Sequence, residues 1–139
     1  PEHIRICVDE LHADRLGHGV RAAEDPALLD RIIERGVALE VCPVSNVALG
    51  VYSDLTSVPL PQLMAAGATI ALGADDPLLF GSRLAGQYAT MRVAHELSDA
   101  ALADLARGSI RASRAPDEVK AELLSGVDSW LSEPDEPAE

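Results

Sequence analysis

Aromatic side chains are scarce in this chain, which has one Phe, one Trp and two Tyr among its 139 residues. A core must therefore be built from Ala, Leu, Val and Ile, and the 47% of hydrophobic residues is enough to build one. The two cysteines, Cys7 and Cys42, are too few for a disulfide scaffold and have no CxxC spacing. We therefore expect two reduced thiols in a cytoplasmic protein.

Basic residues are also few, because 11 Lys and Arg stand against 23 Asp and Glu, for a net charge of −12. Such a surface repels nucleic-acid phosphates and anionic lipids, so we expect neither a nucleic-acid nor a membrane partner. No hydrophobic run approaches the ~20 residues that cross a bilayer, and no secretory leader is recognisable. Because the chain begins at Pro1 rather than Met, we expect a piece of a longer protein.

Helix start and stop signals divide much of the chain. Asp25-Pro26 is typical of an N-cap followed by proline in the first turn, and Gly36 is typical of a left-handed C-terminal residue. Such signals and apolar residues at helical spacing predict helices near 2–11, 26–36, 59–66, 83–97, 98–108 and 116–131. The first helix is expected to bury Leu11, and the last Val119, Leu123, Val127 and Trp130.

Short apolar runs near 14–18, 37–42 and 69–73 predict buried strands between these helices. Strands separated by helices are normally parallel and joined by right-handed crossovers. A complete (β/α)8 barrel needs about 250 residues. We therefore expect an α/β fold over 1–131 that forms the last three βα units of such a barrel plus C-terminal helices. A flexible acidic tail is expected at 132–139.

Polar residues follow each predicted strand at its carboxyl end, where parallel α/β folds gather ligands and catalytic groups. These clusters are Gly17-His18-Gly19, Cys42-Pro43-Val44-Ser45-Asn46 and Asp75-Asp76-Pro77. A histidine between glycines has room for its ring, and it can ligate a metal or stabilise charge. Two adjacent carboxylates repel each other unless a cation or donor is near.

Each cluster also has an ordinary structural interpretation. A Gly-His-Gly segment fits a turn with an incidental surface histidine, and Asp before Pro fits a helix N-cap. The Pro-x-Ser-Asn segment is a common turn sequence. On three successive parallel strands, however, the clusters would converge on one mouth of a barrel.

Together, the segments 15–19, 39–46 and 74–77, with Phe80-Gly81 behind them, resemble the adenosine deaminase family. The resemblance covers nearly the whole chain. Members are zinc-containing (β/α)8 barrels that hydrolyse the 6-amino group of a purine to a carbonyl and release ammonia. The resemblance therefore implies deamination of the adenosine-to-inosine type. Adenosine, free adenine and an adenine-bearing metabolite such as aminodeoxyfutalosine all remain open as substrates.

Matched residue by residue, the resemblance implies separate roles. His18 would orient the zinc-activated water and stabilise charge, Asp75 would ligate Zn²⁺, and Asp76 would hydrogen-bond a purine ring nitrogen. The family's HxH pair and His-Ala-Gly-Glu motif are absent from this chain. We therefore expect the remaining zinc ligands in the N-terminal half of the same barrel, and we expect the 139-residue piece alone to be inactive and to bind no stoichiometric zinc.

One departure from the family pattern keeps a second interpretation open. Gly73-Ala74 stand where relatives carry Asn-Thr or Asn-Ser, so polar groups beside the expected metal ligand are missing. The alternative is a degenerate, non-catalytic barrel homologue that binds a nucleoside or a protein partner.

Overall fold

The computed structural model describes residues 1–133, so most of the predicted acidic tail lies outside the described residues. The first half contains α1 (Glu2–Asp9), β1 (Arg15–Gly17), the 3-10 helix η1 (Gly19–Glu24), α2 (Pro26–Glu34), β2 (Ala38–Val41) and α3 (Pro43–Ala48). The second half contains η2 (Leu55–Ser57), α4 (Leu60–Ala65), β3 (Ile70–Leu72), α5 (Pro77–Phe80), α6 (Leu84–His95), α7 (Asp99–Ala112) and α8 (Asp117–Ser132).

The three strands form one parallel sheet in the order β1-β2-β3. Leu39 of β2 is in register with Leu16 of β1 on one side and with Ile70 of β3 on the other. All three of these side chains are buried. The predicted parallel strands and their positions are therefore confirmed, and all three carboxyl ends lie at the same edge of the sheet.

Local signals explain where two of the helices begin. The Asp25 carboxylate accepts a hydrogen bond from the Leu28 backbone N–H at 3.0 Å, and Pro26 occupies the first turn of α2. Ser98 caps α7 in the same way, because its hydroxyl accepts from the Ala101 N–H at 3.2 Å. Sequence analysis predicted both starting points correctly.

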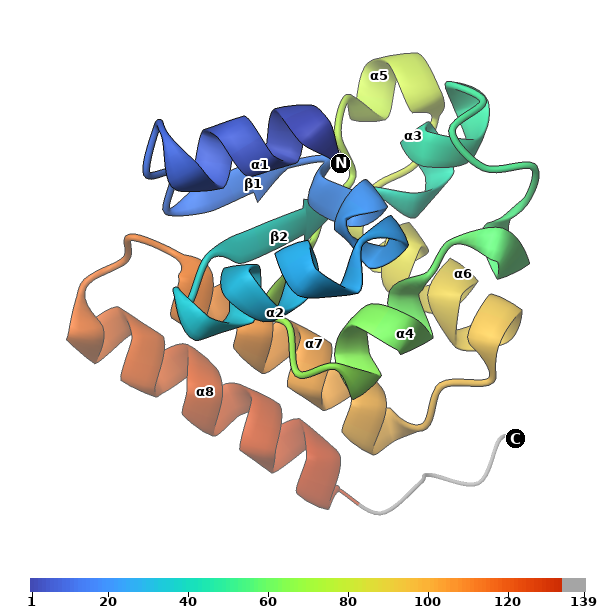
Figure 1. The fold of residues 1–139 in the computed structure, drawn as a ribbon. Helices are drawn as coiled ribbons and strands as arrows, with labels where there is room; N and C mark the ends of the chain where they lie inside the picture. The colour runs from blue at the N-terminus through green and yellow to red at the C-terminus, as the bar shows by residue number, and fades with distance from the viewer. Residues whose placement is uncertain (134–139) are drawn as a thin grey trace.

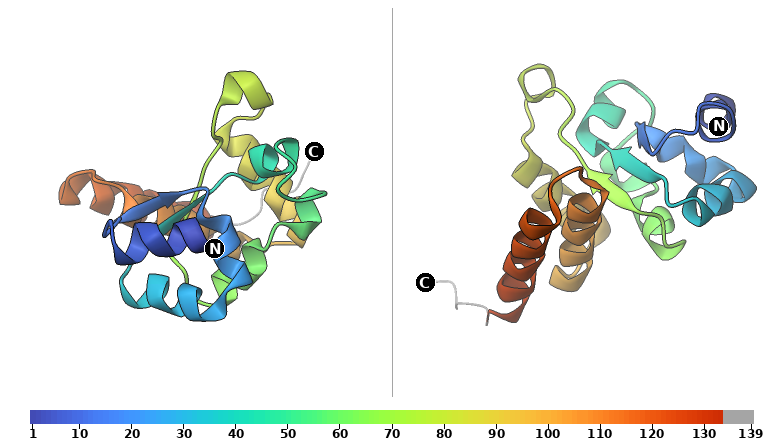
Figure 2. Two further views of the ribbon diagram at one scale, coloured as in Figure 1. Left: turned by 45° about the horizontal axis from the view of Figure 1, so that its top comes forward. Right: turned by 90° about the vertical axis from the view of Figure 1, so that its left-hand side faces the viewer.

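The helices are distributed unevenly around the sheet. Helices α7 and α8 lie on the side of the outer strand β3, whereas α1 and α2 lie on the side of the other outer strand, β1 (Figure 2, right). Helix α7 packs along β3 and α8 packs mainly against α7 (Figure 1). The short helix α5, which follows β3, projects from the carboxyl edge of the sheet (Figure 2, left). Within residues 1–133, no helix is long and apolar enough to cross a membrane.

Helix α7 is longer than the sequence predicted. Gly108 is not its stop signal, because the helix continues to Ala112. A Cβ built on Gly108 would lie 2.5 Å from the Ile70 carbonyl oxygen of β3. Gly108 is therefore required because α7 approaches β3 closely at this position. From the local sequence alone, a glycine with this role looks the same as a glycine that ends a helix.

Four residues that were expected to be buried are exposed. Val119, Leu123 and Trp130 of α8 are 39%, 49% and 45% exposed, because the described part of the chain covers α8 mainly from the side of α7. Leu11 is 69% exposed, since α1 ends at Asp9 and the chain turns away from the helical face before reaching it.

Candidate active site at the carboxyl edge of the sheet

His18 and Asp75 meet at the carboxyl edge, although 57 positions of sequence separate them. His18 directly follows β1, and Asp75 follows β3 by three positions. Their side chains face each other, with the His18 Nε2 atom 3.3 Å from the Asp75 Oδ2 atom. The side chains are 44% and 27% exposed, so a ligand can reach both.

Both residues have left-handed backbone conformations, with φ of 55° at His18 and 56° at Asp75. A left-handed non-glycine residue is unfavourable by about 1–2 kcal/mol, and such strain concentrates at functional sites, where the surrounding fold holds it in place. His12 and Glu96 are left-handed as well. The carboxyl edge is the candidate site because there two left-handed residues, each just after a strand, bring their side chains together.

The left-handed turn at Asp75 also separates the two adjacent carboxylates. Asp76 returns to an extended conformation and caps α5, since its Oδ1 accepts hydrogen bonds from the Leu78 and Leu79 N–H groups at 3.0 Å each. The capping interpretation of Asp76 is therefore correct in this structure. Its Oδ2 atom makes no hydrogen bond within residues 1–133, which leaves that oxygen available to a ligand.

The two glycines beside His18 have different roles. A Cβ on Gly19 would lie 2.7 Å from the Leu39 Cδ2 atom, so Gly19 is needed for η1 to pack on β2. A Cβ on Gly17 would make only an ordinary contact, 3.7 Å from the Glu40 Oε2 atom. The second glycine of the motif thus serves packing rather than close approach of a ligand.

Cys42 lies behind Asp75 in the interior. Burial raises the pKa of its thiol, the negative charge of Asp75 adds to that effect, and a backbone hydrogen bond from Asp75 opposes it. A Cβ on Gly73 would lie 3.0 Å from the Cys42 Sγ atom. A side chain at position 73 would therefore compete with this sulfur for space.

A metal ion fits this edge only in part. The Asp75 carboxylate and the His18 imidazole are oxygen and nitrogen donors of the kind that Zn²⁺ accepts. A catalytic zinc generally has three protein ligands and a water. Residues 1–133 contain no group of three or more His, Cys, Asp or Glu side chains placed to hold a metal. The residues present can thus form one wall of a zinc site but not a complete one.

Comparison with known proteins places this arrangement in a family. Residues 1–130 match the adenosine deaminase family. The chain belongs to that family. It is 63% identical over 131 residues to a putative adenosine/adenine deaminase of Streptomyces coelicolor and 42% identical over 137 residues to an adenine deaminase of Cupriavidus necator. These alignments cover 94% and 98% of this chain.

The fold agrees with this membership. The crystal structure of an adenine deaminase from Arthrobacter aurescens superimposes with a TM-score of 0.91 at 36% identity, over 95% of this chain and 40% of that one. The fold is thus that of the C-terminal portion of a (β/α)8-barrel deaminase. This chain spans 38% and 39% of the length of the two curated relatives.

The segment after β2 in this family member is more ordered than the sequence predicted. The predicted turn is the short helix α3, in which Ser45 and Asn46 are almost fully buried. The Ser45 hydroxyl donates to the Cys42 carbonyl at 3.2 Å, which is a structural role. Asn46 instead reaches His18, with its Nδ2 atom 3.5 Å from the His18 Nδ1 atom.

A second buried amide was missed altogether. Gln87 of α6 is fully buried, and its Oε1 accepts a hydrogen bond from the Val44 N–H at 3.3 Å. Its Nε2 donates to the Ser82 hydroxyl at 3.0 Å. This side chain ties α3 to the segment before α6. Nothing local in the sequence marks it, because an isolated Gln in a helix is normally exposed.

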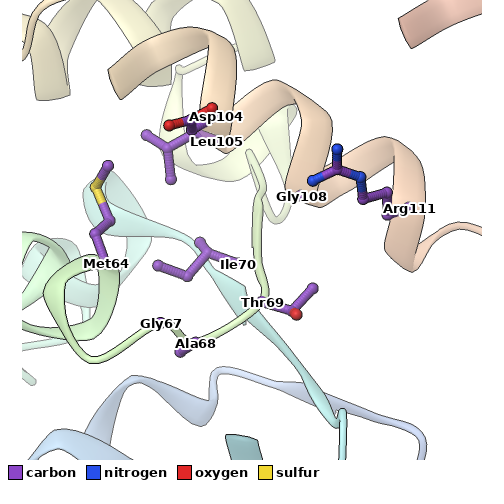
Figure 3. Close-up of a pocket in the computed structure, with 9 residues that line it drawn as sticks. All are labelled: Met64, Gly67, Ala68, Thr69, Ile70, Asp104, Leu105, Gly108 and Arg111. Atoms are coloured by element: carbon purple, nitrogen blue, oxygen red, sulfur yellow. The ribbon is translucent and has the colours of Figure 1, made fainter. Parts of the chain in front are cut away.

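A hollow of about 400 Å³ lies at the amino end of β3, at the edge of the sheet opposite to the carboxyl edge. Thr69, Ile70, Asp104 and Arg111 are among its lining residues (Figure 3). None of the predicted site residues lines it. In parallel barrels the amino edge serves stability and the carboxyl edge serves catalysis, so this hollow is not the candidate site.

Proposed function

We propose that this chain forms the C-terminal part of a hydrolytic aminopurine deaminase. The reaction replaces the 6-amino group of the purine with the oxygen of water and releases ammonia. The observation that carries the proposal is the pair of His18 and Asp75, whose side chains meet at 3.3 Å from left-handed positions just after two strands. The similarity to an adenosine/adenine deaminase and to an adenine deaminase favours adenine or adenosine as the substrate. Aminodeoxyfutalosine remains open.

In this proposal Asp75 supplies one ligand to Zn²⁺, and the rest of the barrel supplies the others. When bound, zinc lowers the pKa of a coordinated water to about 7, so that hydroxide is available at neutral pH. The Nε2 atom of His18 faces Asp75, and an N–H there donates to the attacking oxygen and orients it. The free Oδ2 of Asp76 contacts a purine ring nitrogen.

The test uses the full-length parent, meaning the longer protein that we expect to contain this chain. Zinc content and ammonia release are measured with adenine, adenosine and aminodeoxyfutalosine in parallel. We expect about one zinc per active site and ammonia from at least one substrate. The 139-residue chain alone serves as a control and should retain no stoichiometric zinc, because it lacks a complete set of ligands. Failure of the parent to release ammonia from all three substrates would overturn the proposal.

A second function is favoured by one observation. At Gly73, the nearby Cys42 sulfur leaves little space for the polar side chain that the family resemblance leads us to expect there. A non-catalytic homologue that binds a nucleoside or a protein partner would tolerate this loss. In the same experiment, that protein would bind one of the purines, as calorimetry can detect, and would release no ammonia.

A further inference from the structure

Asn46 has no role in the assignments made so far, yet it is the buried polar side chain nearest to the site. It is 1% exposed, and its Nδ2 atom lies 3.5 Å from the His18 Nδ1 atom. This is the outer limit of a hydrogen bond, and catalytic contacts of this kind commonly tighten when the ligand binds. Its Oδ1 atom is buried without a hydrogen-bond partner among residues 1–133.

The two neighbours of His18 together define its tautomer. An ionised carboxylate only accepts hydrogen bonds, so the Asp75 Oδ2 atom, 3.3 Å from Nε2, favours a proton on Nε2. In the neutral ring Nδ1 then carries a lone pair, and the Asn46 Nδ2 group can donate to it. The donor and acceptor directions agree along the whole line from Asn46 through His18 to Asp75.

The backbone of Asn46 is well suited to hold such a partner still. Its N–H donates to the Cys42 carbonyl at 2.9 Å, and its carbonyl accepts from the Val51 N–H at 2.9 Å. Helix α3 is held from the other side by Gln87, which accepts the Val44 N–H. His18, by contrast, is nearly half exposed and follows a three-residue strand. The fixed residue of the pair is therefore Asn46.

The unpartnered Oδ1 atom argues against a purely structural role. Burying a polar atom without a partner destabilises a fold, and such atoms are uncommon in native proteins. Ser45, equally buried in the same helix, satisfies its hydroxyl on the Cys42 carbonyl. Asn46 retains an amide whose only side-chain partner in residues 1–133 is the His18 ring.

We propose that Asn46 is a positioning residue that holds His18 with its proton on Nε2 and its ring directed at Asp75. The inference rests on the proposed function, in which His18 contacts the attacking oxygen. Asn46 acts through His18 and touches no reacting atom. A ring with the proton on Nδ1 would present a lone pair to the carboxylate and would have no N–H to donate to the nucleophile.

The experiment compares wild type, Asn46→Asp and Ser45→Ala in the full-length parent. Aspartate has the shape of asparagine but only accepts, so it favours a proton on Nδ1 while Asp75 still favours one on Nε2. Two-bond ¹H–¹⁵N correlation spectra of histidine-labelled protein report which nitrogen of His18 is protonated, and His18→Gln assigns the signal. We expect a ring protonated on Nε2 and not on Nδ1 in wild type and in Ser45→Ala, and a proton on Nδ1 in Asn46→Asp.

Kinetics provide the second readout. Loss of such a supporting partner typically lowers activity by roughly 10–100-fold, and we expect Asn46→Asp to lower kcat to that extent with little change in KM. Ser45→Ala should retain kcat. A His18 Nδ1 atom that stays unprotonated in Asn46→Asp, or an equal loss of kcat in Ser45→Ala, would overturn the inference. The spectra decide the tautomer even in a protein that deaminates nothing, so failure of the proposed function is recognised separately.

Discussion

The carboxyl edge of the sheet and the contact between α7 and β3 are built in opposite ways. At the edge, His18 and Asp75 hold left-handed conformations and remain partly exposed. At the contact, Gly108 has no side chain, so the regular helix α7 can lie against the Ile70 backbone. At the carboxyl edge, polar side chains are presented by residues with strained backbone angles. At the contact between α7 and β3, the absence of a side chain permits close packing.

This difference separates function from stability within one small fold. Strained residues persist where the surrounding structure over-determines them, and the short β1 and β3 are both anchored on the buried β2. The α7 contact supplies part of that anchoring. Substitutions at the edge should therefore affect chemistry more than stability, and substitutions at the contact should do the reverse.

The largest effect is expected for Asp75→Asn in the full-length parent. A neutral amide is a poorer ligand for a divalent cation than a carboxylate, so zinc should be lost and turnover abolished. Metal analysis of the purified protein, together with ammonia release, measures both. Asp76→Asn is the matched control, because it should keep its zinc and lose only turnover or substrate affinity. Equal zinc loss in both variants would refute the separate roles.

His18→Ala should retain zinc and substrate binding but lower kcat. Removing one positioned electrostatic group typically costs roughly 10²–10³-fold, or about 3–4 kcal/mol of barrier. Steady-state kinetics and metal analysis on the same preparation test this. Turnover that survives unchanged would mean that the carboxyl edge serves something other than deamination.

Gly108→Ala is expected to lower the stability of the fold and leave activity nearly unchanged. The new Cβ would be placed 2.5 Å from the Ile70 oxygen, and overpacking of this kind typically costs about 1–3 kcal/mol. Urea unfolding of the parent should show that loss, while kcat per folded molecule stays near wild type. Gly126→Ala in α8 is the control, since no atom of residues 1–133 outside the local helix lies within 4 Å of its new Cβ and alanine favours a helix by about 0.5–1 kcal/mol.

A comparison of His18→Gly with His18→Ala measures the strain at the edge. Both variants remove the imidazole, but only glycine adopts a φ of 55° without steric cost. We expect the glycine variant to be the more stable of the two by about 1 kcal/mol. Urea midpoints of the two variants at equal m-values give the difference. Alanine equal to or more stable than glycine would show that no strain is stored there.

The smallest effect concerns Cys42. Because burial and the Asp75 charge raise the pKa of its thiol, less thiolate is present at a given pH and alkylation is slow. Asp75→Asn removes the second cause only, so iodoacetamide labelling of Cys42 should rise modestly and remain far below its rate in urea. Peptide mass spectrometry follows each cysteine separately. Labelling of native Cys42 as fast as in urea would contradict the assigned burial.

Much of this fold was predictable because its signals are local. The Asp25-Pro26 cap, the short apolar strands and the polar residues after them gave the parallel order and the edge at which His18 and Asp75 meet. Helix ends were less predictable. Gly108 has the same local signature as a stop, and only its distance to β3 explains why the helix continues.

By itself the sequence determined the order of the strands and longer helices, the parallel sheet and the three polar clusters, because hydrophobic periodicity and capping act over a few neighbouring residues. Only the tertiary structure decided what each polar residue does. It turned Asp75 towards His18 and Asp76 towards α5, and it placed Asn46 on the far side of the imidazole. These choices depend on left-handed backbone angles and on contacts between segments distant in sequence, which no local pattern encodes.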